Sequence, residues 1–332
     1  MVAGTEILER ASSGGDAAVD TSSTLSADMS NQIGLIGVPT DVGAGVRGAC
    51  LGPEALRIAG LAKALTGLGH KVSDLGDLDG PPNPDEQPGN GCRNLREVST
   101  WCRLLRDRVT DVAGQGMTPV VLGGDHCIAM GSIAGIAKHC SASGQPLYVL
   151  WFDAHTDFNT PLSSPSGNVH GMPIAALCGR IKDSEFDLGV PTPVVDPSRI
   201  NLFGIRSVDH IEKATLVDSG LKVFDMRAID ERSTFTIMRE ILDEVTAAKG
   251  HLHVSLDVDF LDPSIAPGVG TTVPGGVTYR EAHLCMEMIA ESGLMGSLDL
   301  VELNPLLDEK NKSAELLVDL TGSLFGKATL HR

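Results

Sequence analysis

Six residues that could bind metal ions stand at the ends of three apolar stretches of this sequence. They are His126, which ends VVLGGDH, then Asp153, His155 and Asp157 in LYVLWFDAHTDFN, and Asp257 and Asp259 in HLHVSLDVDFLDP. Each stretch is rich in β-branched residues and is typical of a buried strand. Alternate residues of a strand point the same way, so the side chains that end each stretch can converge on one point.

The residue types in this set favour two divalent metal ions. Burying four aspartates together is prohibitive unless cations neutralise them, and two ions with bridging carboxylates are the simplest solution. Carboxylate oxygens and imidazole nitrogens without a thiolate suit Mn(II) or another octahedral ion better than tetrahedral zinc. Two ions roughly 3.5–4 Å apart would lower the pKa of a bridging water and give hydroxide near neutral pH. Acids that merely cap helices would explain one Asp-x-Asp pair, but not three groups at three strand ends.

The elements that must position these residues alternate along the chain. Strands are expected at residues 32–38, 71–75, 119–122, 147–153, 200–204, 222–225, 252–257 and 297–303. Helices are expected at 53–67, 95–113, 127–139, 235–248, 279–291 and 313–325, with Pro53 in a first turn. This alternation predicts a three-layer αβα fold with an eight-stranded parallel sheet. An open sheet of this kind places its site at the carboxyl ends of the strands.

Length and composition bound the domain organisation. A chain of 332 residues can form one large α/β domain, expected here at 31–332 because no linker interrupts it. Residues 1–30 are acidic and rich in Ser, Ala and Gly, so we expect them to be disordered. They have neither the basic start nor the apolar core of a signal peptide.

Charge and cysteine content exclude several classes of partner and site. The formal net charge of −17 argues against nucleic-acid binding through a basic surface. No apolar run approaches the length of a membrane helix, so no membrane partner is expected. The seven cysteines contain no Cys-x-x-Cys pair, which favours free thiols and a cytoplasmic location.

GGDH, DAHTD and SLDVDFLDP together resemble the signature motifs of the ureohydrolase family, which contains arginases, agmatinases and formimidoylglutamases. The resemblance extends from IGVPTDVGAG to VELNP. The segment DAHTDFNTPLSSPSGNVHGMPIAAL is similar to arginases in its Asn-Thr-Pro, Ser-Gly-Asn and His-Gly-x-Pro runs, whereas agmatinases resemble it only through DAHTD. The resemblance therefore implies hydrolysis of L-arginine to L-ornithine and urea at two Mn(II) ions. It also implies a homotrimer or homohexamer.

The same resemblance implies a set of substrate-binding residues. It assigns the α-carboxylate of arginine to Asn159, Ser166 and Asn168, and the α-amino group to Asp209, with Glu212 as a second candidate. It also places Thr271 or its neighbour Thr272 near the substrate. Ser207 departs from the pattern, because animal arginases usually have another aspartate there.

Catalytic roles follow for three residues. By resemblance, Asp157 hydrogen-bonds the attacking hydroxide and passes its proton to the departing amine. His170, in HGMP, relays protons to bulk water, which the ordinary pKa of histidine suits. Glu302, in LVELNP, pairs with the substrate guanidinium, and such a pair is planar and bidentate.

Other functions remain as alternatives. Residues 43–48 match GxGxxG, but Gly52-Pro53 delays the helix and no acid follows about twenty residues later, so a loop beside the metal cleft is favoured over a dinucleotide site. The chain could instead cleave agmatine or a guanidino acid, or bind metal without catalysis. A zinc deacetylase of similar fold would not need all six ligands. Urea release would separate these functions.

Overall fold

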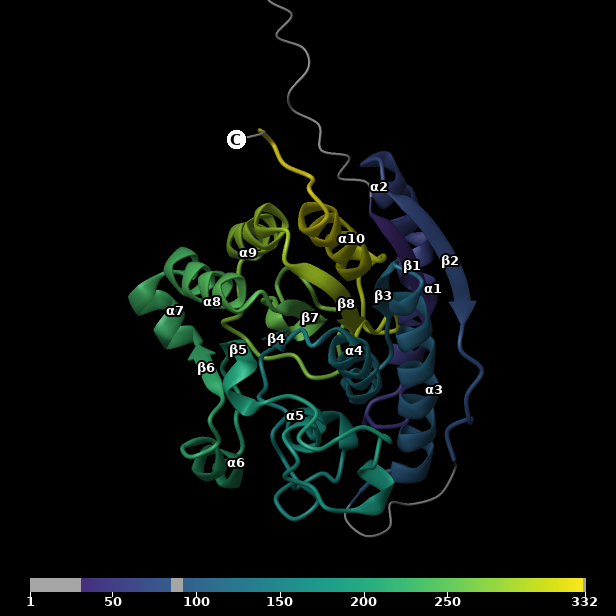
Figure 1. Cartoon of the computed structure of the whole chain (residues 1–332), viewed down its shortest axis with the longest axis vertical. Coiled ribbons are helices and arrows are strands. Elements are labelled where there is room, and N and C mark those ends of the chain that lie inside the picture. Colours follow the sequence, from purple (N-terminus) through teal and green to yellow (C-terminus); the bar gives the residue numbers. More distant parts are fainter. Residues whose placement is uncertain (1–30, 85–91, 331–332) are drawn as a thin grey trace, which may run out of the picture. The chain divides into compact units, whose positions relative to one another are not determined.

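A single sheet of eight parallel strands runs through the protein, in the order β2-β1-β3-β8-β7-β4-β5-β6 (Figure 1). The computed structural model describes residues 31–84 and 92–330, so the segment expected to be disordered, 1–30, lies outside the described residues. The strands are β1 (Gln32–Gly37), β2 (Lys71–Asp77), β3 (Thr118–Leu122), β4 (Leu147–Phe152), β5 (Ile200–Ile205), β6 (Lys222–Asp225), β7 (His251–Asp257) and β8 (Met295–Val301). The predicted eight-stranded parallel sheet is therefore confirmed.

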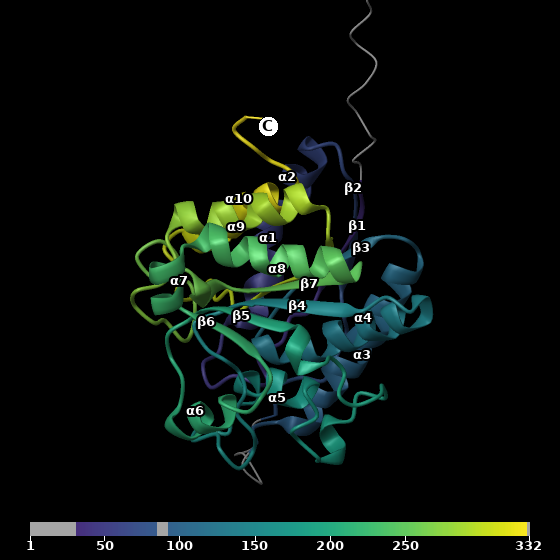
Figure 2. The same cartoon turned by 60° about the vertical axis from the view of Figure 1, so that its left-hand side comes forward.

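Helices cover both faces of this sheet, which makes the three layers that the sequence predicts (Figure 2). One face packs against α1 (Gly52–Ile58), α2 (Leu61–Gly67), α8 (Thr234–Ala248), α9 (Tyr279–Ser292) and α10 (Lys312–Leu324). The other packs against α3 (Leu95–Gly114), α4 (Ala129–Ser143) and α5 (Pro173–Leu177). Two short helices, α6 (His210–Leu216) and α7 (Met226–Arg232), flank β6.

Strand β4 shows why the central strands are apolar throughout. Its alternate residues Tyr148, Leu150 and Phe152 join the core beneath α8 and α9. The residues between them, such as Val149 and Trp151, join the core beneath α3 and α4. A strand buried on both faces needs apolar residues at every position, so the burial of all six β4 residues follows from its place in the sheet.

Replacing Leu150 by alanine should lower the free energy of unfolding by about 2–5 kcal/mol, because the cavity cannot collapse in a core buried on both faces. Leu150 is 0% exposed, whereas Leu162, in a surface loop, is 97% exposed. Leu162→Ala is therefore the matched control and should change stability by less than about 0.5 kcal/mol. Urea unfolding of both variants checks this, and equal losses would contradict the buried position of Leu150.

The helices differ from the sequence expectation in three respects. The expected helix 53–67 is two helices, α1 and α2, because Gly60 between them adopts a left-handed conformation with φ of 88°. The expected helix 127–139 begins with a 3-10 turn, His126–Ile128, before α4. Pro53 does lie in the first turn of α1. The short helices α5, α6 and α7 were not predicted, since they have only five or seven residues.

The sheet order brings the chemically important strand ends together. Strands β3, β8, β7 and β4 are neighbours at the centre of the sheet and all run in the same direction. His126 follows β3, Glu302 follows β8, Asp257 ends β7 and Asp153 follows β4. Residues far apart in the sequence therefore meet at one edge, as the topology of an open parallel sheet predicts.

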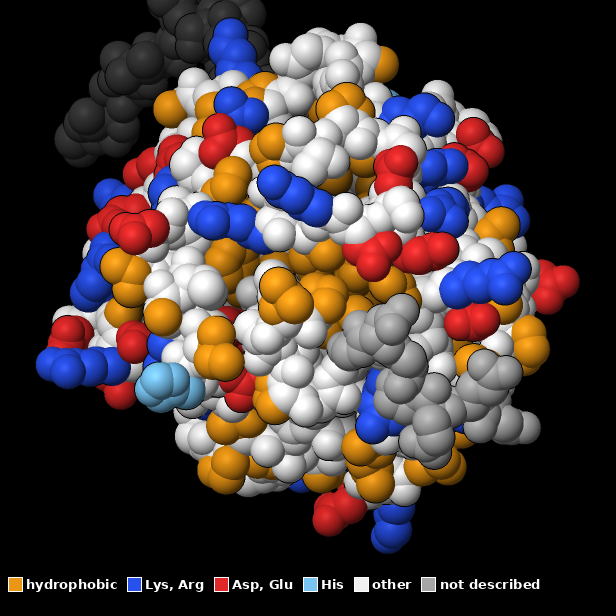
Figure 3. Space-filling view, turned by 90° about the horizontal axis from the view of Figure 1, so that it is seen from below, with side chains coloured by type: hydrophobic (Ala, Val, Ile, Leu, Met, Phe, Trp, Pro, Cys, Tyr) orange, Lys and Arg blue, Asp and Glu red, His pale blue; other side chains and the backbone are white. Residues whose placement is uncertain are grey.

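The surface combines scattered charge with local apolar areas. Figure 3 shows one face on which hydrophobic side chains gather in a hollow, while acidic and basic side chains are interspersed around it. Among the described residues, no helix is both long and apolar enough to cross a bilayer.

Candidate active site

A cavity of about 280 Å³ lies at the carboxyl ends of the central strands. Every residue assigned to the site from the sequence lines it: His126, Asp153, His155, Asp157, Asn159, Ser166, Asn168, His170, Asp209, Glu212, Asp257, Asp259, Thr271 and Glu302. Thr271 lines the cavity, and its hydroxyl donates to Asp259 Oδ2 at 3.0 Å. The structure therefore places Thr271, the first of the two neighbouring threonines, against the carboxylates predicted to bind metal.

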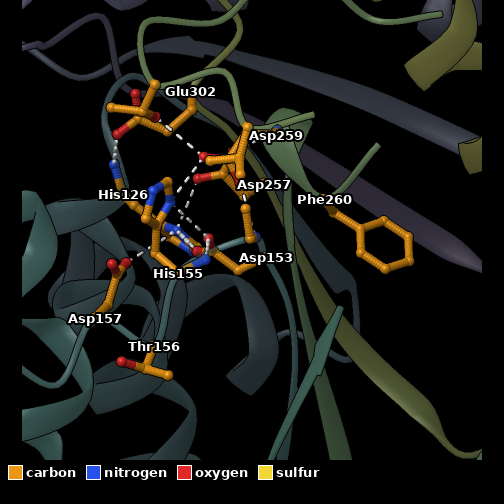
Figure 4. Close-up of polar contacts among 12 residues, drawn as sticks. His126, Asp153, His155, Thr156, Asp157, Asp257, Asp259, Phe260 and Glu302 are labelled. Atoms are coloured by element: carbon orange, nitrogen blue, oxygen red, sulfur yellow. Dashed lines mark hydrogen bonds and ion pairs between the residues drawn. The ribbon is translucent and has the colours of Figure 1, made fainter. Parts of the chain in front are cut away.

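The predicted metal ligands form two groups that share one carboxylate (Figure 4). In the first group, His126 Nδ1 lies 2.9 Å from Asp153 Oδ2 and 3.1 Å from Asp257 Oδ2. In the second, His155 Nδ1 lies 3.0 Å from Asp259 Oδ2 and 3.4 Å from Asp153 Oδ1. Asp153 thus turns one oxygen toward each group, which is the arrangement of a carboxylate that bridges two ions.

Asp157 lies beside these groups rather than inside either of them. Its Oδ2 is 3.4 Å from His126 Nδ1. The backbone of Asp157 has a φ of 47°, and that of Glu302 a φ of 62°. Residues other than glycine rarely adopt this left-handed conformation, and such strain clusters at functional sites. At both positions the strained backbone aims a carboxylate into the cavity.

Neighbouring side chains fix the orientation of the His126 ring. Trp151 stacks on it at 3.8 Å with 5° between the ring planes. His126 Nε2 lies 2.8 Å from Ser255 Oγ, and the indole of Trp151 donates to Asp153 Oδ2 at 3.0 Å. These contacts leave His126 Nδ1 facing the carboxylates, where it is buried without a hydrogen-bond partner among the described residues.

The electrostatics of the cluster favour a bound cation. Burial and the charge of Asp153 raise the pKa of Asp157 well above its usual range. Burial and the charges of Asp259 and Asp153 do the same for Asp257. Burial opposes charge on Asp153 too, but the adjacent imidazoles of His126 and His155 outweigh it and lower the pKa of Asp153. Together with the unpartnered His126 Nδ1, this set of hard donors fits divalent ions, which invert such pKa shifts.

The metal-free protein should become less stable as the pH rises from 6 to 8. Charged Asp157 and Asp257, whose pKa values are raised, destabilise the fold, and protonation relieves that cost as the pH falls. Burial opposes charge on His155, but Asp153 and Asp259 raise its pKa to about 12. Because the pKa of histidine in the unfolded chain is about 6.5, the stability from His155 is complete below that pH and declines above it.

Bound metal should reverse this fall in stability with rising pH, because protons compete with metal for the same ligands. The difference in Tm between Mn-loaded and chelator-treated protein should accordingly be larger at pH 8 than at pH 6. Thermal unfolding at both pH values, with Mn(II) and with chelator, measures it. A metal-free protein with a higher Tm at pH 8 would contradict this electrostatic description of the cluster.

Glu302 joins two histidines with a single oxygen. Its Oε1 lies 2.8 Å from the backbone nitrogen of His126 and 2.8 Å from Nδ1 of His170. Burial opposes charge on both side chains, but their mutual attraction raises the pKa of His170 and lowers that of Glu302. His170 Nδ1 therefore carries the proton toward the carboxylate, and Nε2 is left for exchange. Glu302 Oε2 accepts no hydrogen bond from the described residues and so is free to bind a ligand.

Hydrogen bonds connect the residues expected to bind substrate. Asn159 Nδ2 donates to Asp209 Oδ2 at 2.9 Å, and Asn159 Oδ1 accepts from Ser163 at 2.9 Å. Glu212 is occupied by the chain, since it accepts from Phe158 N at 2.8 Å and from Asp209 N at 3.2 Å. It forms a capping box with Asp209 at the start of α6. Glu212 thus holds Asp209 at the cavity wall.

Comparison with known proteins identifies the family. The model of the arginase family matches residues 31–326. An arginase from Agrobacterium fabrum is 45% identical over 301 residues, which cover 90% of this chain and 92% of the relative. The crystal structure of arginase from Bacillus caldovelox matches with a TM-score of 0.86 and 43% identity, covering 90% of this chain and all of that one.

The chain belongs to the arginase family. It is an arginase-type ureohydrolase, as the GGDH, DAHTD and SLDVDFLDP motifs predict. The arginase from Bacillus subtilis, 42% identical with a TM-score of 0.83, supports the same assignment. A formimidoylglutamase from Bacillus subtilis has a TM-score of 0.71 at 23% identity, and that likeness shows the fold alone.

Some residues of this arginase-family site were missed in the sequence. Trp151 and Ser255 orient His126, and each precedes a ligand of the same strand by two residues. That spacing puts them on the same strand face as Asp153 and Asp257, so alternation could have found them. Three further lining residues, Ser164, Pro165 and Gly171, carry no comparable signal because they lie in a loop or in a single 3-10 turn.

The GxGxxG loop lies beside the cleft of this family member, as expected. Ala44, Gly45 and Val46 line a small cavity of about 30 Å³ that also touches His170 and Glu302. The loop is followed by a 3-10 turn, Ala49–Leu51, before α1 begins. It therefore borders two of the predicted catalytic residues, and it does not lead directly into a helix as a dinucleotide-binding loop would.

Proposed function

We propose that this chain hydrolyses the guanidinium group of L-arginine to L-ornithine and urea, using two Mn(II) ions. The observation that carries the proposal is the pair of ligand groups that share Asp153 at one end of the cavity. The predicted α-carboxylate donors Asn159, Ser166 and Asn168 line the same cavity. The arginases among the relatives support L-arginine as the substrate.

The metal ions would be held by the six predicted ligands. His126, Asp153 and Asp257 would hold one ion and His155, Asp153 and Asp259 the other, with Asp157 beside the first group. When bound, two such ions would lower the pKa of a bridging water and supply hydroxide near neutral pH as the nucleophile. The remaining work falls to side chains that move protons and orient the substrate.

Asp157 and Glu302 are placed to act on the guanidinium. Asp157 Oδ1 accepts no hydrogen bond from the described residues, so it can take the proton of the nucleophile and pass it to the departing amine. Glu302 Oε2 is likewise available, and would orient the guanidinium by a charge-assisted hydrogen bond. Because Oε1 already accepts from His126 and His170, this pairing would use one oxygen in place of the two expected from the sequence.

His170 would carry protons between the cavity and solvent. Its side chain is 14% exposed, and Nε2 remains for exchange once Nδ1 donates to Glu302. A histidine whose other nitrogen is held by a carboxylate keeps one tautomer and orientation. His170 is also the only described histidine of the cavity that belongs to neither ligand group.

His170→Ala should lower kcat for L-arginine by about 10²–10⁴-fold, because a positioned acid or base contributes about that much. Metal content should not change, since His170 belongs to neither ligand group. His139→Ala, half-buried in α4 and not among the residues that line the cavity, is the matched control and should retain full activity. Unchanged kcat in His170→Ala would exclude the proton-transfer role.

Urea release from L-arginine by the Mn-loaded protein tests the proposed function. Urea from agmatine or guanidinobutyrate, but not from arginine, would replace it with another ureohydrolase activity. No urea from any of these substrates, with metal bound, would indicate a metal-binding protein without catalysis. The homotrimer or homohexamer and the cytoplasmic location stay predictions, and light scattering would test the former.

A further inference from the structure

We propose that Asp125 is a positioning residue for the proton-transfer histidine, His170, and acts on it through the backbone of Gly43. Neither the metal groups nor the cavity lining includes Asp125. Its side chain is nevertheless 0% exposed, in the turn that precedes His126. The kinetic part of this proposal rests on the proposed function, whereas its structural part does not.

Both oxygens of Asp125 are used to hold backbone amides. Gly43 N donates to Oδ2 at 2.8 Å, and Cys127 N donates to Oδ1 at 3.0 Å. The first contact joins residues 82 positions apart, so the carboxylate fastens the loop after β1 to the turn after β3. A capping role alone would require only the contact with Cys127.

Gly43, which Asp125 holds in place, in turn binds the backbone of His170. The carbonyl oxygen of Gly43 accepts from the backbone nitrogen of His170 at 3.2 Å. His170 Nδ1 meets Glu302 Oε1 at 2.8 Å, and the same oxygen accepts from His126 N at 2.8 Å. Since His126 follows Asp125 directly, these bonds close a ring. His170 is thus held at its backbone by Gly43 and at its side chain by Glu302.

The contact between the loop and the carboxylate favours glycine at position 43. A Cβ atom on Gly43 would lie 2.9 Å from Asp125 Oδ1 and 3.0 Å from Sγ of Cys127. Real Cβ atoms essentially never lie within 3.0 Å of a neighbouring atom, so the contact with Asp125 would force one of the two groups to shift. The opening glycine of the GxGxxG match is therefore explained by the approach of Asp125, with no nucleotide involved.

The physical consequence concerns the precision of proton transfer. Catalytic geometry must be held within about 0.5 Å, and a shift of about 1 Å can cost about 100-fold in rate. An asparagine at position 125 keeps the size of the side chain but can accept from only one of the two amides, because its NH₂ group donates. The loop at Gly43, and with it His170, would lose its support.

Asp125→Asn should lower kcat for L-arginine by about 10–100-fold, with KM changed less than about threefold and the ions per chain unchanged. In a His170→Ala background the same substitution should lower kcat by less than about twofold, because residues that act through one another are not additive. Asp225→Asn is the matched control, since Asp225 accepts from Ala228 N at the start of α7. Asparagine can still accept that single amide through its side-chain oxygen, so this variant should keep both its cap and its kcat.

Thermal unfolding of the metal-free protein supplies a readout independent of activity. Asp125→Asn and Gly43→Ala should each lower Tm, and the double variant should lower it by clearly less than the sum, because both disturb one contact. Additive losses would overturn the structural link. An equal fall of kcat with and without His170, or a loss of metal in Asp125→Asn, would overturn the positioning role. If the wild-type protein released no urea, the proposed function would fail. The Tm values of the two single variants and the double variant would still test the contact between Asp125 and Gly43.

Discussion

Asp153→Asn is expected to remove both metal ions and to lower kcat/KM for L-arginine by at least about a thousandfold. Asp153 is the carboxylate common to the two ligand groups, with one oxygen facing each. An amide offers one oxygen without charge, so neither ion would keep its bridging ligand. Without ions the site has no activated water, which is the largest contribution expected of such a centre.

Comparison with Asp257→Asn tests whether Asp153 is shared by the two ions. Asp257 belongs to one group only, so this variant should retain about one ion per chain while losing most of its activity. Asp225→Asn, outside the cavity, should retain two ions and full activity. Elemental analysis and urea assays on the same samples measure both effects. Retention of two ions by Asp153→Asn would exclude the bridging role.

Agmatine is expected to be a poorer substrate than L-arginine by several orders of magnitude. Asn159, Ser166 and Asn168 line the cavity and are suited to an α-carboxylate, which agmatine lacks. Leaving such donors unpaired in a closed site costs about 1–3 kcal/mol each, and sites built around a polar group reject analogues without it by about 10⁴–10⁵. Values of kcat/KM for both substrates give the ratio.

Asp209 should contribute to the same discrimination through the α-amino group. It is held by Asn159 and by the capping box with Glu212, so its carboxylate is fixed at the cavity wall. Asp209→Ala should chiefly raise KM for arginine and leave the metal content unchanged, because the α-amino group is remote from the bond that breaks. Equal hydrolysis of agmatine and arginine, or a silent Asp209→Ala, would contradict the arginine assignment.

The strands and the position of the site could be predicted, because the apolar pattern of each strand agrees with the topology of an open parallel sheet. Strand β4 is apolar at every position, which only a strand buried on both faces requires. The ligands follow such strands directly, so their meeting point required only the rule for open parallel sheets. The break at Gly60 was missed because a glycine within a helical pattern is often tolerated. In the structure Gly60 instead has a left-handed φ of 88°, which glycine adopts readily and which ends α1.

The roles of polar residues were harder to predict, because a residue type does not show which partner occupies it. Glu212 has the charge to bind an amino group, but the backbone of Phe158 and Asp209 occupies its oxygens. Glu302 has two oxygens, yet one is shared by His126 and His170. Such assignments depend on contacts between loops distant in sequence, which motif and spacing do not encode.

Titration of chelator-treated protein with Mn(II), measuring urea release from L-arginine alongside bound metal, tests the central claim most directly. The binuclear site predicts that activity saturates at two ions per chain, with less than proportional activity at one ion. Full activity at one ion per chain, or no urea from arginine with two ions bound, would contradict it.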